Sequence, residues 1–369
     1  MQISSSLLGL VSPSSVRAPR VRVIANGVPV VGVTDADIAS TNHYAADRFS
    51  VDVALGADPQ LGPAFWASES DISVEVQMSL DGGASFTSLI EGAVDTVDLD
   101  PIIGTARVAG RDRTAALIET RTQETFANRT SSEIAQILAA RHGLGAQVKQ
   151  TSTPVGRYYQ DEHDRITLDQ FSRATTEWDL LVFLARQESF DVFVRGSTLF
   201  FQPPSEPDGA IVVLRPVDCL DLRLERALTL ARDLEVTVKS WNSRQQNAFT
   251  QTARSRAQKS LGGAPQRYVY VRPNLTSDQA LKLAQQILTE LTRHERVVAL
   301  TMPGELVITP RSLVGLQGTG TEFDQIYYVD HIERSIRAEG GFVQHIRAKN
   351  MSPQSQATPP ADIVASVTG

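Results

Sequence analysis

Cysteine is nearly absent from this sequence of 369 residues: Cys219 is its only one, and aromatic residues make up only 6%. A single cysteine excludes a disulfide within the chain and a zinc site built from several cysteines. The sequence also lacks an apolar run near the length of about 20 residues that a transmembrane helix needs. The short apolar cluster at Leu7 and Leu8 has no basic residue before it, unlike a signal peptide. We therefore expect a soluble protein that is made in the cytoplasm and contacts no membrane.

Acidic residues outnumber basic ones: the sequence has 42 Asp and Glu and 35 Lys and Arg, which gives a formal net charge of -7. Proteins that bind nucleic acid normally carry a basic face, so this balance argues against specific DNA binding. The polar stretch 244–264 is predicted to be a loop. This stretch and the residues just after it contain a cluster of basic side chains, called the basic concentration below: Arg254, Arg256, Lys259 and Arg267. We expect these side chains to be solvated or to meet an acidic neighbouring subunit.

Length and composition are those of a folded protein with more than one core. Apolar residues make up 41% of the chain and charged residues 21%, as in ordinary globular proteins. A chain of this length exceeds what one hydrophobic core usually organises. Two or three domains are therefore expected.

The region after an N-terminal arm alternates between apolar and polar side chains, which is the pattern of half-buried strands. Asn26-Gly27 separates two valine-rich runs and predicts a hairpin with a tight turn. Further strands are predicted at four ranges: 49–55, 72–80, 88–98 and 105–110. Short strands at this spacing favour an antiparallel barrel or sandwich for residues 20 to about 112.

The stretch 178–204 changes its apolar period partway along. From Trp178 to Ala185 apolar residues recur at i, i+3, i+4 and i+7, which puts one stripe on a helix. After Glu188 apolar and polar residues alternate, and Arg195-Gly196 interrupts the alternation, which predicts a hairpin. The middle of the chain therefore contains a compact α+β unit.

A second helix is predicted upstream of this unit, where the sequence turns helical from Thr114. Thr130 and Glu133 have the spacing of a capping box, which marks a helix start. Gly143 followed by Leu144 matches a Schellman stop.

A second β-rich region begins near residue 217. Strands are predicted at six ranges: 220–230, 234–241, 297–302, 313–316, 325–336 and 342–348. Apolar residues from Ala280 to Leu291 form one stripe of a helix, which Thr276 and Gln279 can cap. Residues 351–369 are rich in Ser, Pro and Gln and predict a tail with no core of its own.

No cluster in the sequence has the spacing of a catalytic or metal site. Asp161-Glu162-His163-Asp164 could supply a base or a ligand, but consecutive side chains point in different directions, so a solvated acidic turn is expected. His331 and His345 lie on the two arms of the terminal hairpin, and two nitrogens without a third ligand make a poor metal site. Three other histidines fall at predicted loops or helix ends: His43, His142 and His294. We predict no catalytic residue, no cofactor and no metal.

Several motifs in the middle of the chain form one ordered set. A helix opening on Trp178-Asp179 is followed by Glu188-Ser-Phe-Asp-Val192 and a hairpin ending in Leu199-Phe-Phe201. Three upstream pieces complete the set: Gly110-Arg-Asp-Arg-Thr-Ala-Ala-Leu-Ile118, Phe126-Ala-Asn-Arg-Thr-Ser-Ser-Glu133 and Val155-Gly-Arg-Tyr-Tyr-Gln160. The ordered set spans roughly residues 110–201. It resembles the motifs of phage tail baseplate hub proteins, the late control protein D family, in their order, and the spike base of type VI secretion systems is related to that family.

The resemblance implies a β-rich α+β fold with two antiparallel β-barrel domains, each like the tail-tube protein, and a small α+β middle domain. The implied limits are an N-terminal arm at 1–19, a first barrel domain at 20–113, a middle domain at 114–216, a second barrel domain at 217–350 and an extended tail at 351–369. The halves of the sequence cannot be aligned with each other, so the duplicated barrel rests on the resemblance.

The resemblance also implies a structural role in the tail baseplate of a virion. Members of this family are homotrimers, and two barrels per chain let three chains offer six similar surfaces. The implied partners are the tail tube protein, a trimeric spike, and tape measure and baseplate wedge proteins. The candidate partner-contact residues are two apolar pairs in the terminal segments: Leu7, Leu8, Ile363 and Val364. A net negative charge suits a channel through which DNA passes without adsorbing.

Two alternative functions are weighed against the hub. A tail-associated peptidoglycan hydrolase would need a catalytic domain, and the short arm and tail leave no length for one. A receptor-binding or carbohydrate-binding module at the tail tip would expose clusters of aromatic residues, and the few aromatics occupy mostly core-like positions.

Overall fold

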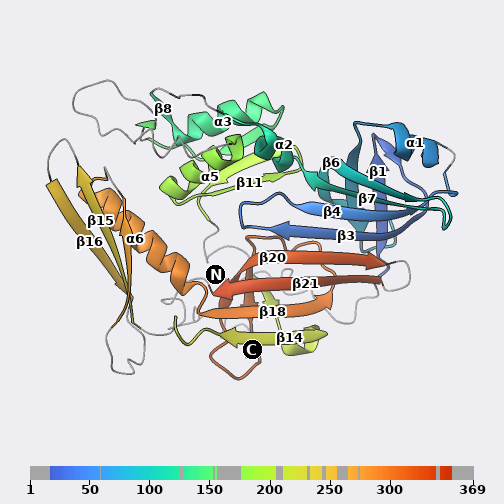
Figure 1. Cartoon of the computed structure of the whole chain (residues 1–369). Helices are drawn as coiled ribbons and strands as arrows, with labels where there is room; N and C mark the ends of the chain where they lie inside the picture. The colour runs from blue at the N-terminus through green and yellow to red at the C-terminus, as the bar shows by residue number, and fades with distance from the viewer. Residues whose placement is uncertain are drawn as a thin grey trace.

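The computed structural model describes residues 17–58, 60–122, 124, 126, 128–152, 154–155, 176–204, 211–230, 233–242, 247–255, 265–272, 275–337 and 341–350. These residues form a β-rich fold with few helices and mainly antiparallel sheets, as predicted (Figure 1). None of the helices in these ranges is long and apolar enough to cross a membrane.

The first part of the chain is built from seven strands and one short helix. They are β1 (Arg20–Ala25), β2 (Val28–Pro29), β3 (Val33–Thr41), β4 (Arg48–Ala54), α1 (Pro63–Ser68), β5 (Ser73–Ser79), β6 (Thr87–Asp100) and β7 (Thr105–Asp112). The predicted hairpin at Asn26-Gly27 is confirmed, and both turn residues have positive φ, as a type I′ turn requires. The four predicted strand ranges correspond to β4, β5, β6 and β7.

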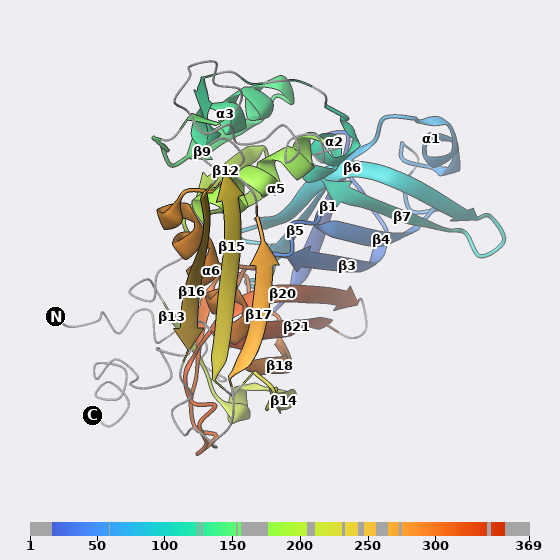
Figure 2. The ribbon, with the colours of Figure 1, turned by 60° about the vertical axis from the view of Figure 1, so that its left-hand side comes forward.

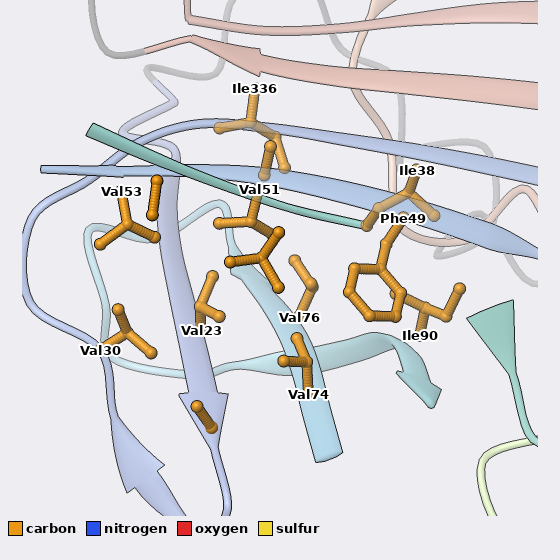
Figure 3. Packing of buried hydrophobic residues seen from close by; sticks show 14 of the residues in the cluster. Val23, Val30, Ile38, Phe49, Val51, Val53, Val74, Val76, Ile90 and Ile336 are labelled. Carbon is orange, nitrogen blue, oxygen red and sulfur yellow. The ribbon is translucent and has the colours of Figure 1, made fainter. Parts of the chain in front are cut away.

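One face of these strands encloses an apolar core. Phe49, Val51, Val74 and Val76 are buried in this core, and their side chains point toward one another (Figure 3). Every second residue of β4 and β5 is buried, which is the twofold period that the sequence shows.

The middle of the chain forms a separate layer of helices and short strands above this sheet (Figure 1). Its elements are α2 (Thr114–Glu119), β8 (Arg129–Thr130), α3 (Ser131–Arg141), β9 (Gly145–Val148), β10 (Pro154–Val155), α5 (Glu177–Glu188), β11 (Asp191–Arg195) and β12 (Thr198–Gln202). The predicted helix and hairpin of residues 178–204 are confirmed as α5, β11 and β12. Their core has Leu181, Leu184 and Phe201 fully buried.

Both predicted ends of α3 are present in the structure. Thr130 Oγ1 accepts a hydrogen bond of 3.3 Å from Glu133 N, and Glu133 Oε2 accepts one of 2.9 Å from Thr130 N. At the other end Leu144 N donates to Ala139 O at 2.9 Å, which is the long hydrogen bond of a Schellman motif.

The remainder of the chain contributes to two different sheets. Its elements are β13 (Ile211–Leu214), η2 (Pro216–Asp218), β14 (Asp221–Arg226), β15 (Leu234–Asn242), β16 (Asn247–Ser255), β17 (Gln266–Val271), α6 (Ser277–Thr292), β18 (Arg296–Pro303), β19 (Leu313–Leu316), β20 (Ile326–Arg337) and β21 (Gly341–Asn350). The predicted helix is confirmed as α6, with its capping box of Thr276 and Gln279.

The interpretation of residues 244–264 as a loop is wrong for residues 247–255. These residues form β16, which pairs antiparallel with β15 along its whole length. Polar and apolar residues alternate in β15 but not in β16, where Thr250, Gln251 and Thr252 follow one another and resemble loop composition. β15, β16 and β17 form a small sheet with α6 packed on one face, where Val236 and Ala280 are fully buried (Figure 2).

One large sheet joins the first and last parts of the chain. Its strand order is β14-β18-β21-β20-β3-β4-β7-β6-β5-β1-β2, and β13 and β19 branch from β20. The joint is the antiparallel pairing of β20 with β3, from His331 opposite Thr41 to Arg337 opposite Asp35. The strands that the structure describes therefore bring both β-rich regions into one sheet, and the closure of each region into its own barrel stays a prediction.

Candidate functional site

The sequence-predicted contact residues lie in segments that the structure does not describe. Leu7 and Leu8 precede the first described residue, and Ile363 and Val364 follow the last. The acidic cluster 161–164 also lies outside the described residues. These interpretations stay predictions.

The two histidines of the terminal hairpin do not lie opposite each other. His331 pairs in register with Arg347, and His345 pairs with Glu333. His331 Nε2 lies 3.0 Å from Glu333 Oε1, and His345 Nδ1 lies 2.8 Å from Thr301 Oγ1. Within the described ranges no group of three His, Cys, Asp or Glu side chains could hold a metal ion.

The other three histidines occupy the predicted loops and helix ends. His142 caps the C-terminus of α3, and its Nε2 lies 2.6 Å from Oε2 of the buried Glu177, which also pairs with Arg141. Burial lowers the pKa values of His43 and His294 below the ordinary value. At neutral pH these two side chains are therefore mainly neutral, and the cation nearest to the buried Asp330 is Lys349, whose Nζ lies 3.8 Å from Asp330 Oδ2.

Two aspartates that are distant in sequence lie side by side near the junction with the middle layer, where Asp47 precedes β4 and Asp112 ends β7. Asp112 N donates to Asp47 O at 2.9 Å, while Thr114 N and Oγ1 donate to the Asp112 carboxylate at 3.1 Å each. Burial raises the pKa of Asp112 to about 7, with a further contribution from the negative charge of Asp47. Burial also raises the pKa of Asp47.

This pair has the chemistry of an acid and a base but no room for a substrate. The cavity beside it, which Trp178 and Arg311 help to line, measures about 10 Å³, the space of one water molecule. Sequence reasoning did not single out these carboxylates, because nothing in the spacing of Asp47 and Asp112 brings them together. We assign the pair a structural role at the junction.

The basic concentration is partly neutralised within the chain where the structure describes it, because two arginines share one carboxylate. Arg254 Nε lies 2.8 Å from Glu235 Oε2, and Arg267 Nε lies 3.3 Å from Glu235 Oε1. Register places Glu235 between them, on the middle strand of the small sheet. The acidic partner that the sequence led us to expect on a neighbouring subunit is thus in this chain for these two residues. Arg256 and Lys259 lie outside the described residues.

The most extensive candidate surface is the polar face of eight consecutive strands in the large sheet. The run β14-β18-β21-β20-β3-β4-β7-β6 is antiparallel throughout. Charges of opposite sign neighbour each other across its strands. Arg107 Nε lies 3.3 Å from Asp52 Oδ1, and Arg337 Nε lies 3.4 Å from Asp35 Oδ1. This face is suited to water rather than to burial in a core.

The eight-stranded run has an open edge at each end. β14 pairs with β18 on one side, and no described strand pairs with its other side. At the opposite end β5 covers the first part of β6, up to Ala93. Beyond it, the segment Thr96–Asp100 pairs with β7 alone among the described strands. Unpaired N–H and C=O groups on such edges are ready to accept another strand.

The two ends of the strands in this run differ. At one end the middle layer is attached, because Trp178 Nε1 donates to Tyr44 O at 2.8 Å and Tyr328 Oη donates to Asp191 Oδ2 at 2.7 Å. At the other end the β6–β7 turn and the start of β14 carry exposed apolar side chains. Figure 1 shows the middle layer above and to the left, and the β6–β7 turn at the right.

Comparison with solved structures identifies proteins of similar fold. No protein-family model and no curated protein matches the chain. The 43 kDa tail protein of prophage MuSo2 from Shewanella oneidensis is similar in structure, with a TM-score of 0.67, 17% identity and coverage of 90% of this chain and 98% of that one. The tail protein of Neisseria meningitidis MC58 has a TM-score of 0.67 and 14% identity, covering 92% and 99%.

A secretion component is also similar in structure. The E. coli c3393 protein, a component of the type VI secretion system, has a TM-score of 0.52 and 13% identity, covering 91% of this chain and 79% of that one. The chain therefore has the fold of phage tail proteins and of type VI secretion components, which is the resemblance that its motifs indicate.

Proposed function

We propose that this protein is a structural subunit of the baseplate hub in a phage or phage-like tail, and that it acts as a homotrimer. The observation that carries the proposal is the eight-stranded run, to which each β-rich region contributes four strands. β3, β4, β6 and β7 come from the first region, and β14, β18, β20 and β21 from the last. Two equal contributions per chain would give a trimer six similar units.

This multiplicity suits an adaptor between a hexameric tail tube and a trimeric spike. A partner with sixfold symmetry needs six similar contacts, and a trimer offers them only if each chain carries two. The middle layer occurs once per chain, so it would offer three contacts on its side. The likeness in fold to two tail proteins over nearly their whole length supports this role. The E. coli secretion component adds support, because it is itself structurally similar to the T4 bacteriophage tail proteins gp27 and gp5.

The polar face of the run is suited to line the channel of such a hub. Its charges are paired with opposite charges on neighbouring strands, as in the Arg107–Asp52 and Arg337–Asp35 pairs. A wall of this kind offers DNA no continuous basic track, and the net charge of -7 opposes adsorption of phosphate. The proposed place of the protein is therefore the tail of the virion, with DNA able to pass through the hub.

A structural role without catalysis is part of this proposal. The buried carboxylates Asp47 and Asp112 have no space beside them for a polymer such as peptidoglycan. Further proposed partners are the tape measure and baseplate wedge proteins. Leu7, Leu8, Ile363 and Val364 remain the proposed contacts of the terminal segments with a spike or a neighbouring chain.

Co-expression with the tail tube and spike subunits of the same phage or phage-like particle tests the proposal. We expect the full chain to copurify with both subunits and to elute at a mass that includes three copies. A chain that binds neither subunit under the conditions in which they assemble would overturn the hub function. Zymography on cell-wall substrate provides the second arm, and a cleared band would overturn the proposal that the protein is not an enzyme.

A further inference from the structure

The middle layer, from α2 to β12, meets the large sheet at a junction that contains the buried carboxyl groups of Asp47 and Asp112. We propose that this junction is a pH-sensitive switch: the middle layer stays docked while the carboxyl group of Asp112 holds its proton, and it separates from the sheet more readily once that proton is lost. The movement takes place within one chain, so the inference goes beyond the proposed hub function and does not depend on it.

The middle layer has a core of its own. Its buried cluster includes Leu117, Leu184 and Phe201, and among the described residues Tyr44 is the one member that lies outside residues 117–201. The strands of the large sheet pack their apolar side chains into other clusters. A unit with a separate core is expected to move relative to its neighbour unless a large apolar interface joins the two.

The residues that tie the two parts together do so through polar and charged groups. Trp178 Nε1 donates to Tyr44 O at 2.8 Å, and Tyr328 Oη donates to Asp191 Oδ2 at 2.7 Å. The guanidinium of Arg186 lies 5.2 Å from the centroid of the Tyr44 ring. Because water can take the place of a hydrogen-bond partner, contacts of this kind give the docked state only modest net stability.

Two junction residues have a backbone conformation that residues with side chains rarely adopt. Tyr44, between β3 and β4, has a φ of 56°, and Arg311, between β18 and β19, has a φ of 79°. The guanidinium of Arg311 lies 4.0 Å from the centroid of the Phe193 ring in the middle layer, and Tyr44 accepts the hydrogen bond from Trp178. Docking therefore holds both residues in a conformation that opening can relax, and strain of this kind occurs at switch regions.

Positive charge at the junction acts on Asp47 rather than on Asp112. Burial raises the pKa of Asp47, and the charges of Arg311 and Arg334 oppose this rise. Arg195 of β11 also interacts with the charge of Asp47. The charge that acts on Asp112 is that of Asp47, which is negative and adds to the effect of burial on the Asp112 pKa. Asp112 is therefore the carboxyl group that the docked state keeps protonated.

The arginines on either side of Asp112 are paired with other carboxylates. Arg111 Nε lies 2.6 Å from Asp95 Oδ2, and Arg113 forms an ion pair with Glu91. The cavity beside Asp112 has a volume of about 10 Å³, the space of one water molecule. In the docked state an ionised Asp112 would thus be poorly solvated. Further ionisable side chains at the junction interact with one another: Tyr44 with Arg186, and Tyr328 with Asp191.

Proton binding fixes the direction of the effect. The pKa of Asp112 is about 7 in the docked state, whereas a solvated aspartate has a pKa near 3.9. Between these values the docked state holds a proton that the open state has released, so the equilibrium constant for opening rises up to about tenfold with each pH unit. It should therefore rise roughly 1,000-fold from about pH 4 to about pH 7 and stay constant above pH 7.

Hydrogen exchange of the full chain, measured by mass spectrometry of overlapping fragments from about pH 4 to about pH 8.5, tests the inference. The reporter is the amide of Thr114, which donates to Oδ1 of Asp112 at 3.1 Å. Its exchange rate, divided by the rate of an unstructured amide at the same pH, gives the equilibrium constant for opening. The amide of Leu184, in the core of the middle layer, provides the reference, because it exchanges when that core unfolds.

We expect opening at Thr114 to rise roughly 1,000-fold between about pH 4 and about pH 7 in the wild type, and less than about threefold in Asp112→Asn. Asp98→Asn is the matched control, because that carboxylate is exposed on β6, and it should keep the full rise. Opening that is independent of pH in the wild type, or an unchanged rise in Asp112→Asn, would overturn the switch.

Two further comparisons separate the switch from other effects. Asp47→Asn removes the negative charge beside Asp112, so opening should become constant at a lower pH than in the wild type; an unchanged profile would contradict the role of that charge. At every pH the normalised exchange of Thr114 should be at least about tenfold faster than that of Leu184. Equal values would mean that the amides exchange through global unfolding, which would overturn a separate movement of the middle layer.

Discussion

The hydroxyl of Tyr328 donates a hydrogen bond of 2.7 Å to Oδ2 of Asp191 and so ties the large sheet to the middle layer. Tyr328 belongs to β20, and Asp191 begins β11, which lies far from it in sequence. The ring of Tyr328 is almost completely buried. Burial, reinforced by the neighbouring negative charge of Asp191, raises the pKa of Tyr328 above its ordinary value, so the hydroxyl remains a donor.

Tyr328→Phe should lower the free energy of unfolding by about 1–3 kcal/mol, because it removes a hydrogen bond to a charged acceptor. Denaturant unfolding measures this change. Tyr327→Phe is the matched control, since the hydroxyl of Tyr327 donates to a neutral carbonyl, Phe323 O, at 2.9 Å. If Tyr328→Phe lowers the free energy of unfolding no more than Tyr327→Phe does, the hydrogen bond from Tyr328 to Asp191 is not stronger than one to a neutral acceptor.

Asp112 makes the stability of the protein depend on pH. Its folded-state pKa is raised to about 7, whereas an aspartate in an unfolded chain has a pKa near 3.9. The folded protein therefore holds a proton that the unfolded chain has released, and this group lowers stability as pH rises from about 4 to about 7. Above pH 7 the loss is complete and constant.

Asp112→Asn removes the ionisation; its amide oxygen can accept the hydrogen bond from Thr114 N, and its amide nitrogen can donate to Thr114 Oγ1. We expect the variant to match the wild type near pH 4 and to exceed it by roughly 2–4 kcal/mol above pH 7. Urea unfolding at pH 4, 5.5, 7 and 8.5 measures the difference. A difference that stays constant across this range would show that Asp112 does not titrate as described.

The core of the middle layer should be sensitive to truncation. Leu181 of α5 is fully buried against β11 and β12. Leu181→Ala should therefore lower the free energy of unfolding by about 2–5 kcal/mol, through lost burial and the cavity left behind. Leu228→Ala is the control, because that side chain is largely exposed, and its effect should stay within about 0.5 kcal/mol. Equal effects of the two changes, measured by thermal or denaturant unfolding, would contradict the packing.

The pairing of Arg254 and Arg267 with Glu235 predicts weak affinity for DNA. Non-specific binders hold DNA with dissociation constants of about 100 to 1 µM at physiological salt. We expect fluorescence anisotropy of a labelled duplex to show no binding at protein concentrations up to about 10 µM in 150 mM salt. Submicromolar binding that Arg254→Ala abolishes would mean that this arginine is available to phosphate.

Local sequence signals specified most elements of the fold. Asn26-Gly27 identified a hairpin, and the capping residues Thr130 and Thr276 marked two helix starts, because turns and caps depend on neighbours in sequence. The strand β16 was not predicted, since its run of three polar residues, 250–252, resembles a loop in composition.

The candidate site could not be predicted in the same way. The pairing of β20 with β3 joins residues about 300 positions apart, as the hydrogen bond from Arg337 Nη2 to Asp37 Oδ2 illustrates. Alternation in each strand indicates which side chains face the core, but it does not indicate which strand lies beside it. The open edges of β14 and β6 follow from that order, so they become visible only in the structure.

Mass photometry of the purified full chain, combined with negative-stain images of the same sample, is the decisive experiment for the trimeric hub. A hub of this kind predicts a particle with three times the mass of one chain and an open centre, in which the middle layer appears three times. A particle with the mass of one chain at every concentration, under conditions in which tube and spike subunits assemble, would contradict it.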